Sequence, residues 1–438
     1  MTGMRKARIG LLATAICVWS AAITGPLARA GSATTNTPGP AEDPTGVAIR
    51  TAHAPVVVDP SAHDDKAHHP LSLYVQSQDV NGTPLLTTAT PSGYAPSTIT
   101  KYLGLTGTGK GQTIAVVVAY NAPTISADLT TFDSKFGLAA PPSFKKVSQT
   151  GSTTVFPATD ANWALEASLD VEWAHALAPA AGILLVEANS SSMSDLMAAI
   201  SYASKQTGVS VISNSWGTSG EMSGETTFDA NCKLTKAVCV FSTGDLGNPG
   251  GYPAYSPWVI AVGGTSLSLS TAATGAVTVA GETAWSGSGG GVSAQEARPT
   301  YQATATTATG RSIPDVSYDA DPNTGFAVYD STAYNGSSGW FQMGGTSAGA
   351  PQWSAIIADA NQRRAAAKKA VLAAYITTSP TYRASADLYG LTTGLADITA
   401  GDPNGTCGTV CTVSAGYDSV TGRGSPRSGI DTALTNAP

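Results

Sequence analysis

Short, continuous apolar runs alternate with longer stretches of helical character, and this order restricts the fold more than any other feature of the sequence. The helix-like stretches cover 161–176 and 192–205, and the strand-like runs cover 113–118 (TIAVVV), 183–186, 209–212, 238–241 and 259–262. Because these runs do not alternate between apolar and polar residues, we expect strands that are covered on both faces. Strands that alternate with helices predict an α/β domain with a central, mostly parallel sheet flanked by helices.

The N-terminal part of the chain differs in character from the rest. Arg5, Lys6 and Arg8 precede an apolar stretch at 9–23, and small residues follow at 28–30 (ARA). This pattern predicts a signal peptide over 1–30 and a secreted, extracellular protein. A single membrane anchor is the alternative, but the apolar stretch is short for a bilayer span. Residues 31–93 read as a linker or short pro-segment with little order, and one folded domain is expected over 94–438.

Composition excludes several classes of protein. Charged residues make up 12% and hydrophobic residues 42% of the 438 residues, which fits neither a disordered chain nor a coiled coil. The formal net charge is −7 and the basic residues are scattered, so no nucleic-acid partner is expected. Four cysteines lie outside the signal peptide, and an oxidising compartment favours two local disulfides, Cys232 with Cys239 and Cys407 with Cys411. Zinc ligation by the four thiolates is the weaker alternative.

Ser347 is the candidate nucleophile. It lies in 344–351 (GGTSAGAP), before an Ala-rich stretch at 350–374 that predicts a long helix. Backbone N–H groups at a helix N-terminus can stabilise negative charge, although a simple helix cap would have the same residue types. The segment also matches the G-x-S-x-G elbow of α/β-hydrolases. That motif requires a histidine after the serine, and all five histidines precede it: His53, His63, His68, His69 and His175.

A triad in the order Asp, His, Ser is not supported either. The strand-like run at 113–118 leads into 119–121 (AYN), with no aspartate at its end. Only His175 lies within the expected domain, at a helix end, where we expect a satisfied or solvated side chain.

Carboxyl groups remain as the candidate base. Glu166 and Asp170 are four residues apart, so on a helix they share one face, and two close carboxyls tend to share a proton. A solvated pair on the helix surface is the alternative, but apolar neighbours such as Trp163 and Leu169 favour burial. Asp245 follows the run at 238–241, and in its protonated form it could donate a hydrogen bond to an oxyanion. This chemistry predicts activity in acid.

These residues, taken together with other ordered motifs, resemble the sedolisin (serine-carboxyl peptidase) family. The motifs are Glu166-x-x-x-Asp170, 213–217 (SNSWG), 244–247 (GDLG), 252–254 (YPA), 262–265 (VGGT), 314–316 (PDV), 321–322 (DP) and 345–347 (GTS). The resemblance implies a subtilisin-like fold and an acid-active endopeptidase for peptide or unfolded protein substrates. Removal of the signal peptide would leave no membrane partner, and we expect a monomer. It implies that Ser347 is the nucleophile, Glu166 the general base, Asp170 its orienting partner and Asp245 the oxyanion donor.

The resemblance extends to a metal site and to a cleft edge. It implies one structural Ca²⁺, with the ligand positions Asp397, Ile398, Ser414, Gly416 and Asp418; from the residues alone, the two aspartates could equally be turn formers. The Gly-rich run 286–293 (SGSGGGVS) corresponds to a segment beside the substrate, which assigns peptide binding to Ser288, Gly289 and Gly290.

One departure from the family pattern affects the functional interpretation. Residues 31–93 are too few and too polar to form the large pro-domain that the family usually carries. Maturation is therefore open, and a secreted, non-catalytic peptide-binding protein on a peptidase scaffold stays as the alternative function.

Overall fold

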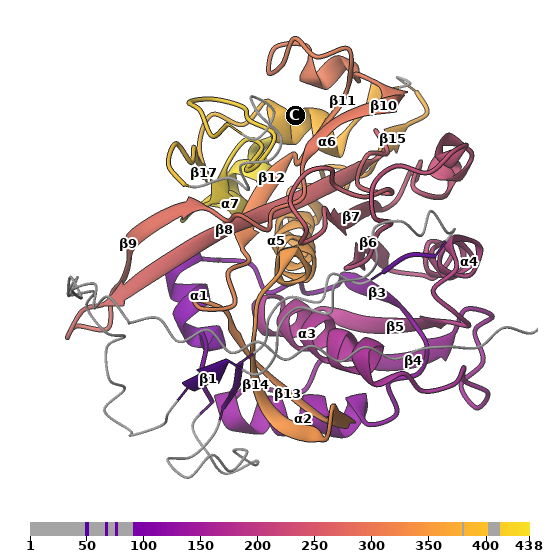
Figure 1. Ribbon diagram of the computed structural model, residues 1–438, viewed down its shortest axis with the longest axis vertical. Helices are drawn as coiled ribbons and strands as arrows, with labels where there is room; N and C mark the ends of the chain where they lie inside the picture. The colour runs from indigo at the N-terminus through magenta and orange to yellow at the C-terminus, as the bar shows by residue number, and fades with distance from the viewer. Residues whose placement is uncertain (1–48, 52–65, 69–74, 78–90, 379–380, 402–411) are drawn as a thin grey trace, which may run out of the picture. The chain divides into compact units, whose positions relative to one another are not determined.

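The computed structural model describes residues 49–51, 66–68, 75–77, 91–378, 381–401 and 412–438. The chain divides into two units, 1–44 and 45–438, and every described residue belongs to the second (Figure 1). The predicted signal peptide and the predicted Cys407–Cys411 disulfide lie outside the described residues.

A central eight-stranded sheet forms the framework of the second unit. Its strand order is β12-β8-β7-β6-β3-β5-β4, with β9 on β8. The strands are β3 (Thr113–Ala119), β4 (Phe144–Ser148), β5 (Gly182–Ala188), β6 (Val209–Asn214), β7 (Val238–Ser242), β8 (Val259–Thr271), β9 (Val277–Ala284) and β12 (Val316–Asp319). Every pair is parallel except β8 with β9. The sequence-based prediction of a mostly parallel sheet is confirmed, and strands β5, β6 and β7 are buried along their whole length.

Helices pack on this sheet. They are α1 (Pro96–Leu103), α2 (Ile125–Phe136), α3 (Ala161–Leu177), α4 (Met193–Ala203), α5 (Thr346–Ala366), α6 (Ala384–Tyr389) and α7 (Ile430–Asn436). Helix α5 lies over β6, β7, β8 and β12 and also contacts α3, as Figure 1 shows at the centre of the molecule. Helix α4 contacts β3 and β5. None of the helices among the described residues is long and apolar enough to cross a bilayer.

A second, antiparallel sheet contains residues that the sequence assigned to a linker. Its order is β1-β2-β14-β13, where β1 is Ile49–Thr51, β2 is Val75–Ser77, β13 is Phe326–Tyr334 and β14 is Ser337–Met343. Parts of the segment 31–93 therefore pair with the domain, which the sequence analysis did not anticipate. The reason is that β14 offers an open strand edge, and pairing with such an edge needs backbone groups more than an apolar pattern.

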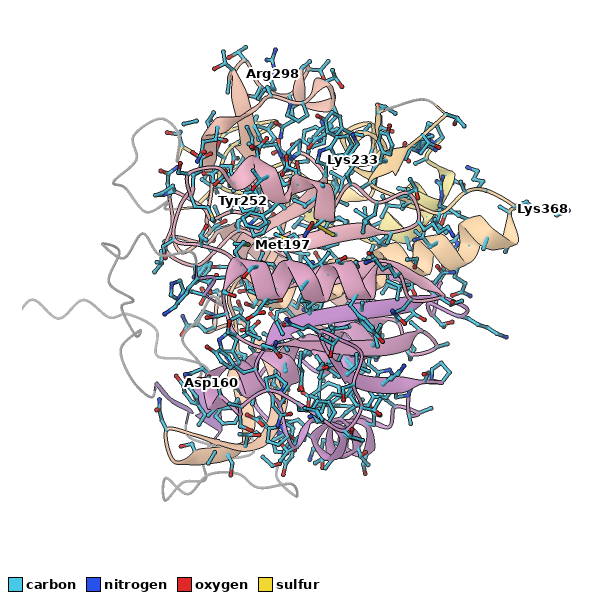
Figure 2. The ribbon with its side chains drawn as sticks, turned by 90° about the vertical axis from the view of Figure 1, so that its right-hand side faces the viewer. Asp160, Met197, Lys233, Tyr252, Arg298 and Lys368 are labelled. Carbon is cyan, nitrogen blue, oxygen red and sulfur yellow. A yellow bond between two sulfur atoms is a disulfide. The ribbon has the colours of Figure 1, made fainter. Side chains whose placement is uncertain are left out.

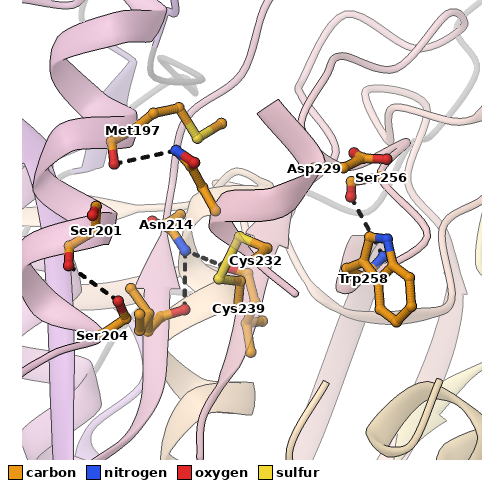
Figure 3. Close-up of a disulfide and its surroundings, with 12 residues drawn as sticks. Met197, Ser201, Ser204, Asn214, Asp229, Cys232, Cys239, Ser256 and Trp258 are labelled. Carbon is orange, nitrogen blue, oxygen red and sulfur yellow. Dashed lines mark hydrogen bonds between the residues drawn. A yellow bond between two sulfur atoms is a disulfide. The ribbon is translucent and has the colours of Figure 1, made fainter. Parts of the chain in front are cut away.

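The other elements are short and lie at the periphery. They are η1 (Glu225–Asn231), β10 (Gly291–Ala297), η2 (Thr300–Gln302), β11 (Gly310–Ile313), β15 (Tyr375–Ile376), β16 (Thr381–Tyr382), β17 (Leu395–Ala396) and β18 (Ser425–Pro426). Strands β17 and β18 and helix α7 lie in the last fifty residues of the sequence. The Cys232–Cys239 disulfide, which was predicted, joins the end of η1 to β7 with a Cα–Cα distance of 5.8 Å (Figure 3).

Candidate active site

Helix α3 carries two carboxyl groups into the protein interior. Asp160, which is labelled in Figure 2, caps its N-terminus. The Asp160 carboxylate accepts hydrogen bonds from the N–H groups of Asn162 and Trp163. Every residue of the helix from Trp163 onward is buried, so the helix has no solvated face. Glu166 is 2% exposed and Asp170 is fully buried. These values exclude the alternative of a solvated surface pair.

Ser347 lies in the first turn of α5, after a tight turn made of two glycines. Gly345 has φ 96° and ψ 159°, a conformation that favours glycine. A Cβ atom at Gly344 would lie 2.5 Å from the carbonyl oxygen of Ala320, so a larger residue cannot occupy that position either. The turn places Ser347, fully buried, beside α3, where its hydroxyl donates a hydrogen bond to Glu166.

The two carboxyls on α3 hold protons more tightly than ordinary acids do. Burial raises the pKa of Glu166 well above its usual value, the charge of Asp245 raises it further, and the hydrogen bond from Ser347 lowers it. Burial also raises the pKa of Asp170 well above its usual value; the charge of Glu166 adds to this and a hydrogen bond from Ser215 opposes it. The couple therefore retains a proton at pH values where an exposed carboxyl would have lost it, as the i, i+4 spacing predicted.

Asp245 lies on the loop after β7, against the N-terminus of α5. Its Oδ1 accepts hydrogen bonds from the N–H of Thr346 at 2.8 Å and from the Thr346 hydroxyl at 2.7 Å. The Thr346 hydroxyl oxygen in turn accepts the N–H of Gly244 at 3.1 Å. Asp245 is half-buried, and the residue that it contacts, Thr346, directly precedes Ser347. One carboxyl oxygen is thus fixed by the helix terminus.

Ser215, just beyond β6, contacts both halves of this arrangement. Its Oγ donates to Asp170 Oδ1 at 2.6 Å and lies 3.2 Å from the backbone carbonyl oxygen of Ser347. This serine belongs to the 213–217 motif, and the sequence alone assigned no role to it. Only the sheet order brings the end of β6 between α3 and α5, so no local signal in the sequence could have indicated the contact.

His175 lies elsewhere, with structural partners. It is fully buried, and its Nε2 lies 3.2 Å from Asp133 Oδ1 and 3.0 Å from the carbonyl oxygen of Ala139. It is a helix-end histidine, as the sequence suggested, but only its Nε2 has partners, while its Nδ1 is buried without a hydrogen-bond partner in the described part of the chain. It is not a partner of the serine.

An extended segment of the chain occupies two backbone edges next to this site. The N–H of Ala67 donates to the carbonyl of Ser191 at 2.7 Å. The N–H of His68 donates to the carbonyl of Gly217 at 2.8 Å, and the N–H of Gly217 returns a bond to the carbonyl of His68 at 2.9 Å. Segment 66–68 therefore runs as a short antiparallel strand between these edges, and Gly217 is only two residues from Ser215. We call the pair of edges at Ser191 and Gly217 the peptide groove.

The Gly-rich run packs closely against the loop of Asp245. The Ser288 hydroxyl accepts from the N–H of Gly264 at 2.8 Å and donates to the carbonyl of Val420 at 2.7 Å. The N–H of Gly289 donates to the carbonyl of Gly244 at 2.8 Å. The carbonyl of Gly290 accepts from Gly250, Asn248 and Tyr255. These contacts lie within the chain, and the assignment of Ser288, Gly289 and Gly290 to peptide binding stays a prediction.

The predicted calcium ligands lie together in one loop cluster. Asp397 is exposed and accepts the N–H of Gly416 at 2.7 Å, while Ile398 is buried with Val420 and Ala284. Asp418 is 5% exposed and accepts the N–H groups of Val420, Thr421 and Ser414. Burial raises the pKa of Asp418, and these backbone hydrogen bonds oppose the rise. The described residues contain no cluster of three or more acidic, histidine or cysteine side chains, so a cation here would rely on backbone carbonyls besides the two carboxylates.

Comparison with known proteins places this arrangement among peptidases. Residues 158–394, which make up 237 of the 438 residues, match the subtilase family. Kumamolisin of Bacillus sp. (strain MN-32) is 30% identical over 313 residues, which cover 63% of this chain and 53% of that protein. Xanthomonalisin of Xanthomonas sp. (strain T-22) is 34% identical over 191 residues, 40% of this chain and 21% of that protein. The chain thus spans about half, or much less, of the curated relatives it matches.

The fold has a counterpart among solved structures. A Pseudomonas sedolisin, described as a serine-carboxyl proteinase complexed with two molecules of pseudo-iodotyrostatin, superposes with a TM-score of 0.63. The match covers 79% of this chain and 98% of that chain at 24% identity, a likeness that supports the subtilisin-like fold and nothing finer.

Proposed function

Since this chain belongs to the subtilase family, and since kumamolisin and xanthomonalisin are 30% and 34% identical to it over the matched residues, we propose that it is a serine-carboxyl endopeptidase of the sedolisin family that is active in acid. The observation that carries the proposal is the hydrogen bond from the Ser347 hydroxyl to Glu166, inside a buried carboxyl couple. A carboxylate is the group placed to take the serine proton.

The reaction follows from these positions. Glu166, ionised within the couple, accepts the Ser347 proton as the hydroxyl oxygen attacks the scissile carbonyl carbon. Asp170 keeps the Glu166 carboxyl oriented. The protonated Glu166 then gives its proton to the leaving amine, which leaves an acyl group on Ser347. Water hydrolyses this ester with Glu166 again as the base.

Asp245 supplies the electrostatic part of catalysis. Its Oδ1 is held by Thr346, so a proton on the other carboxyl oxygen can be donated to the oxyanion of the tetrahedral intermediate. An ionised Asp245 would repel that oxyanion. The need for a protonated Asp245 supports activity in acid and its loss toward neutral pH.

A peptide or unfolded protein is the substrate that fits the groove. Backbone groups at Ser191 and Gly217 already hold an extended segment of this chain, and such pairing recognises main chain more than side chains. The alternative, a secreted peptide-binding protein without catalysis, would use the same groove. It would not need a serine hydroxyl that donates to a buried carboxyl couple, which favours the enzyme.

Calcium is the cation that suits the C-terminal loop cluster. Asp397 and Asp418, with the backbone carbonyls of Ile398, Ser414 and Gly416, would provide oxygen ligands only, which a hard cation prefers. The partial burial of Asp418 and its raised pKa fit a site in which a cation would compensate its charge. The role would be structural. Chelation should lower the melting temperature and restoring Ca²⁺ should recover it; unchanged melting with no bound metal would remove the site.

The setting of the enzyme follows from the N-terminal sequence. We infer export by the signal peptide predicted over 1–30, followed by action as an extracellular monomer without nucleic-acid or membrane partners.

Ser347→Ala tests the function directly. Hydrolysis of denatured protein at pH 4 should fall by at least ~10³-fold, because the nucleophile is lost, and Glu166→Gln should have a similar effect. His175→Gln serves as the control for the excluded triad and should retain the pH dependence of the wild type. Equal cleavage by Ser347→Ala and wild type would exclude the mechanism, and binding without cleavage by either would favour the peptide-binding alternative.

A further inference from the structure

The hydroxyl of Ser215 has two acceptors within reach and one hydrogen to give. It is fully buried, 2.6 Å from Asp170 Oδ1 and 3.2 Å from the backbone carbonyl oxygen of Ser347. A serine hydroxyl donates a single hydrogen bond. One acceptor belongs to the carboxyl couple and the other to the nucleophilic residue itself.

The Ser347 carbonyl cannot form the regular i to i+4 hydrogen bond of an α-helix. In an α-helix this carbonyl would accept the N–H of the residue four positions later, and that residue is Pro351, which has no N–H. Pro351 is buried inside α5, where water is a poor substitute. The Ser215 hydroxyl is positioned to provide the missing bond.

We propose that Ser215 is a positioning residue that couples the protonation state of Asp170 to the backbone of the nucleophile. With Asp170 ionised, the Ser215 hydroxyl donates to Asp170 Oδ1 and holds the carboxylate toward Glu166. With Asp170 protonated on Oδ1, that proton is donated to Ser215 Oγ, and the Ser215 hydroxyl turns to the Ser347 carbonyl. The inference rests on the proposed peptidase mechanism and adds to it a link between α3 and the first turn of α5.

The groups around Asp170 determine how its pKa changes when Ser215 is lost. Burial is the main cause that raises the pKa of Asp170, Glu166 one turn earlier on α3 raises it further, and Ser215 lowers it. From the other elements packed here, Ser215 and Ser347 are neutral, and Asp245 on the loop after β7 acts on Glu166. Loss of Ser215 therefore favours protonated Asp170, so the acidic limb of the kcat profile should move to higher pH.

The experiment compares Ser215→Ala with Ser213→Ala across pH 2.5 to 7. Ser213 is the matched control, since it lies on β6 two residues earlier, is equally buried, and its Oγ has no hydrogen-bond partner among the described residues. We expect Ser215→Ala to lose ~10- to 100-fold in kcat, the factor for one charge-assisted hydrogen bond, with KM little changed and the acidic limb raised by about one pH unit. Ser213→Ala should change neither.

Two more variants keep the test decisive. Ser215→Thr retains the hydroxyl and should restore both kcat and the pH profile; Ser215→Cys keeps the shape with a weaker donor and replaces Ser215→Ala if that variant does not fold. Matching pH profiles of wild type and the alanine or cysteine variant would overturn the inference. If Ser347→Ala is itself fully active, the proposed function fails; if Ser347→Ala is inactive while Ser215→Ala behaves as Ser213→Ala, only the inference about Ser215 fails.

Discussion

At the scale of single residues, environment and not residue type gives the carboxyls their roles. Glu166 and Asp170 are buried on a helix that has no polar face, and both gain a raised pKa from that burial. Asp195 is an acid of the same kind in a half-buried setting on α4. Burial acts to raise its pKa, but hydrogen bonds from Ser190, Gln149 and Ser192 outweigh it, and the pKa is lowered. The pKa values of these carboxyls shift in opposite directions within one molecule, so the surroundings of a carboxyl determine whether it can act as a general base.

Asp245→Asn isolates the role of a single proton. The amide oxygen can still accept from Thr346, which preserves the contact that now measures 2.8 Å, and the NH₂ group can donate to the oxyanion at any pH. We therefore expect the fall in rate between about pH 4 and pH 7 to become shallower. The measurement is kcat against pH for this variant and the wild type.

Asp245→Ala is the control, because it removes the acceptor and the donor together and should lower kcat at every pH. If Asp245→Asn keeps the steep decline of the wild type, the decline has another origin and Asp245 is not the proton donor.

Single residues also show how much of the candidate site could be predicted from the sequence. Spacing alone put Glu166 and Asp170 on one helical face, and the elimination of histidine by chain order pointed to a carboxylate base. Ser215 could not be found in that way. Its bond to Asp170 spans 45 positions and its contact with Ser347 spans 132, so both depend on which strand lies under which helix.

At the scale of elements, the position of α5 on the sheet decides where Ser347 lies. Gly349, two residues beyond the serine, allows this close approach: a Cβ atom there would be 2.6 Å from Val262 Cγ1 on β8 and 3.0 Å from Tyr318 Cβ on β12. The first turn of α5 is therefore packed against side chains of two strands.

Gly349→Ala should destabilise the protein and displace the nucleophile. We expect a loss of about 1–3 kcal/mol in unfolding free energy from overpacking, and a lower kcat because Ser347 moves with the helix. Chemical denaturation and steady-state kinetics measure the two effects. Gly281→Ala on β9 is the control, since nothing lies within 4 Å of its Cβ position. Equal stability of the two variants would contradict the packing argument.

The segment 66–68 is a second element whose position the sequence did not indicate. The described part of this segment is three residues long, too short to give a strand pattern in the sequence, and its partners lie more than a hundred positions away. Because the segment uses the backbone groups proposed for substrate, a peptide must displace it.

Ala67→Pro should therefore lower KM for a short peptide. Proline removes the N–H that Ala67 donates to Ser191, a loss of about 1 kcal/mol for the resident segment, and kcat should stay unchanged. KM would fall by up to about fivefold. A synthetic peptide with the sequence of residues 66–70 (KAHHP) should compete with substrate, and its counterpart with proline at the Ala67 position should compete less. Identical KM values in variant and wild type would mean that the segment does not obstruct the groove.

At the scale of the whole molecule, many buried acids make stability depend on pH in one direction. Burial, as the main cause in each case, raises the pKa of Glu225 and Asp359 to about 8, and that of Glu187, Glu296 and Asp330 to about 7. An acid whose pKa is higher in the folded state than in the unfolded chain binds its proton more tightly when folded. Its contribution to stability is complete below about pH 4 and is lost as the pH rises through the folded-state value.

The melting temperature should therefore decline between about pH 4 and pH 8. Summed over these groups, the loss is on the order of several kcal/mol, or roughly 5–10 °C. Calorimetry at pH 4, 5, 6, 7 and 8 measures it.

Glu225→Gln should reduce the decline, because the amide oxygen still accepts the N–H of Met222, now at 2.7 Å, while no charge develops on deprotonation. Asp195→Asn should behave in the opposite sense and lower the melting temperature at pH 7, since a lowered pKa stabilises the fold only when the carboxyl is ionised. A melting temperature that rises from pH 4 to pH 8 would show that these acids are solvated in the native protein. In that event the raised pKa inferred for Glu166, which has the same physical cause, would lose its basis as well.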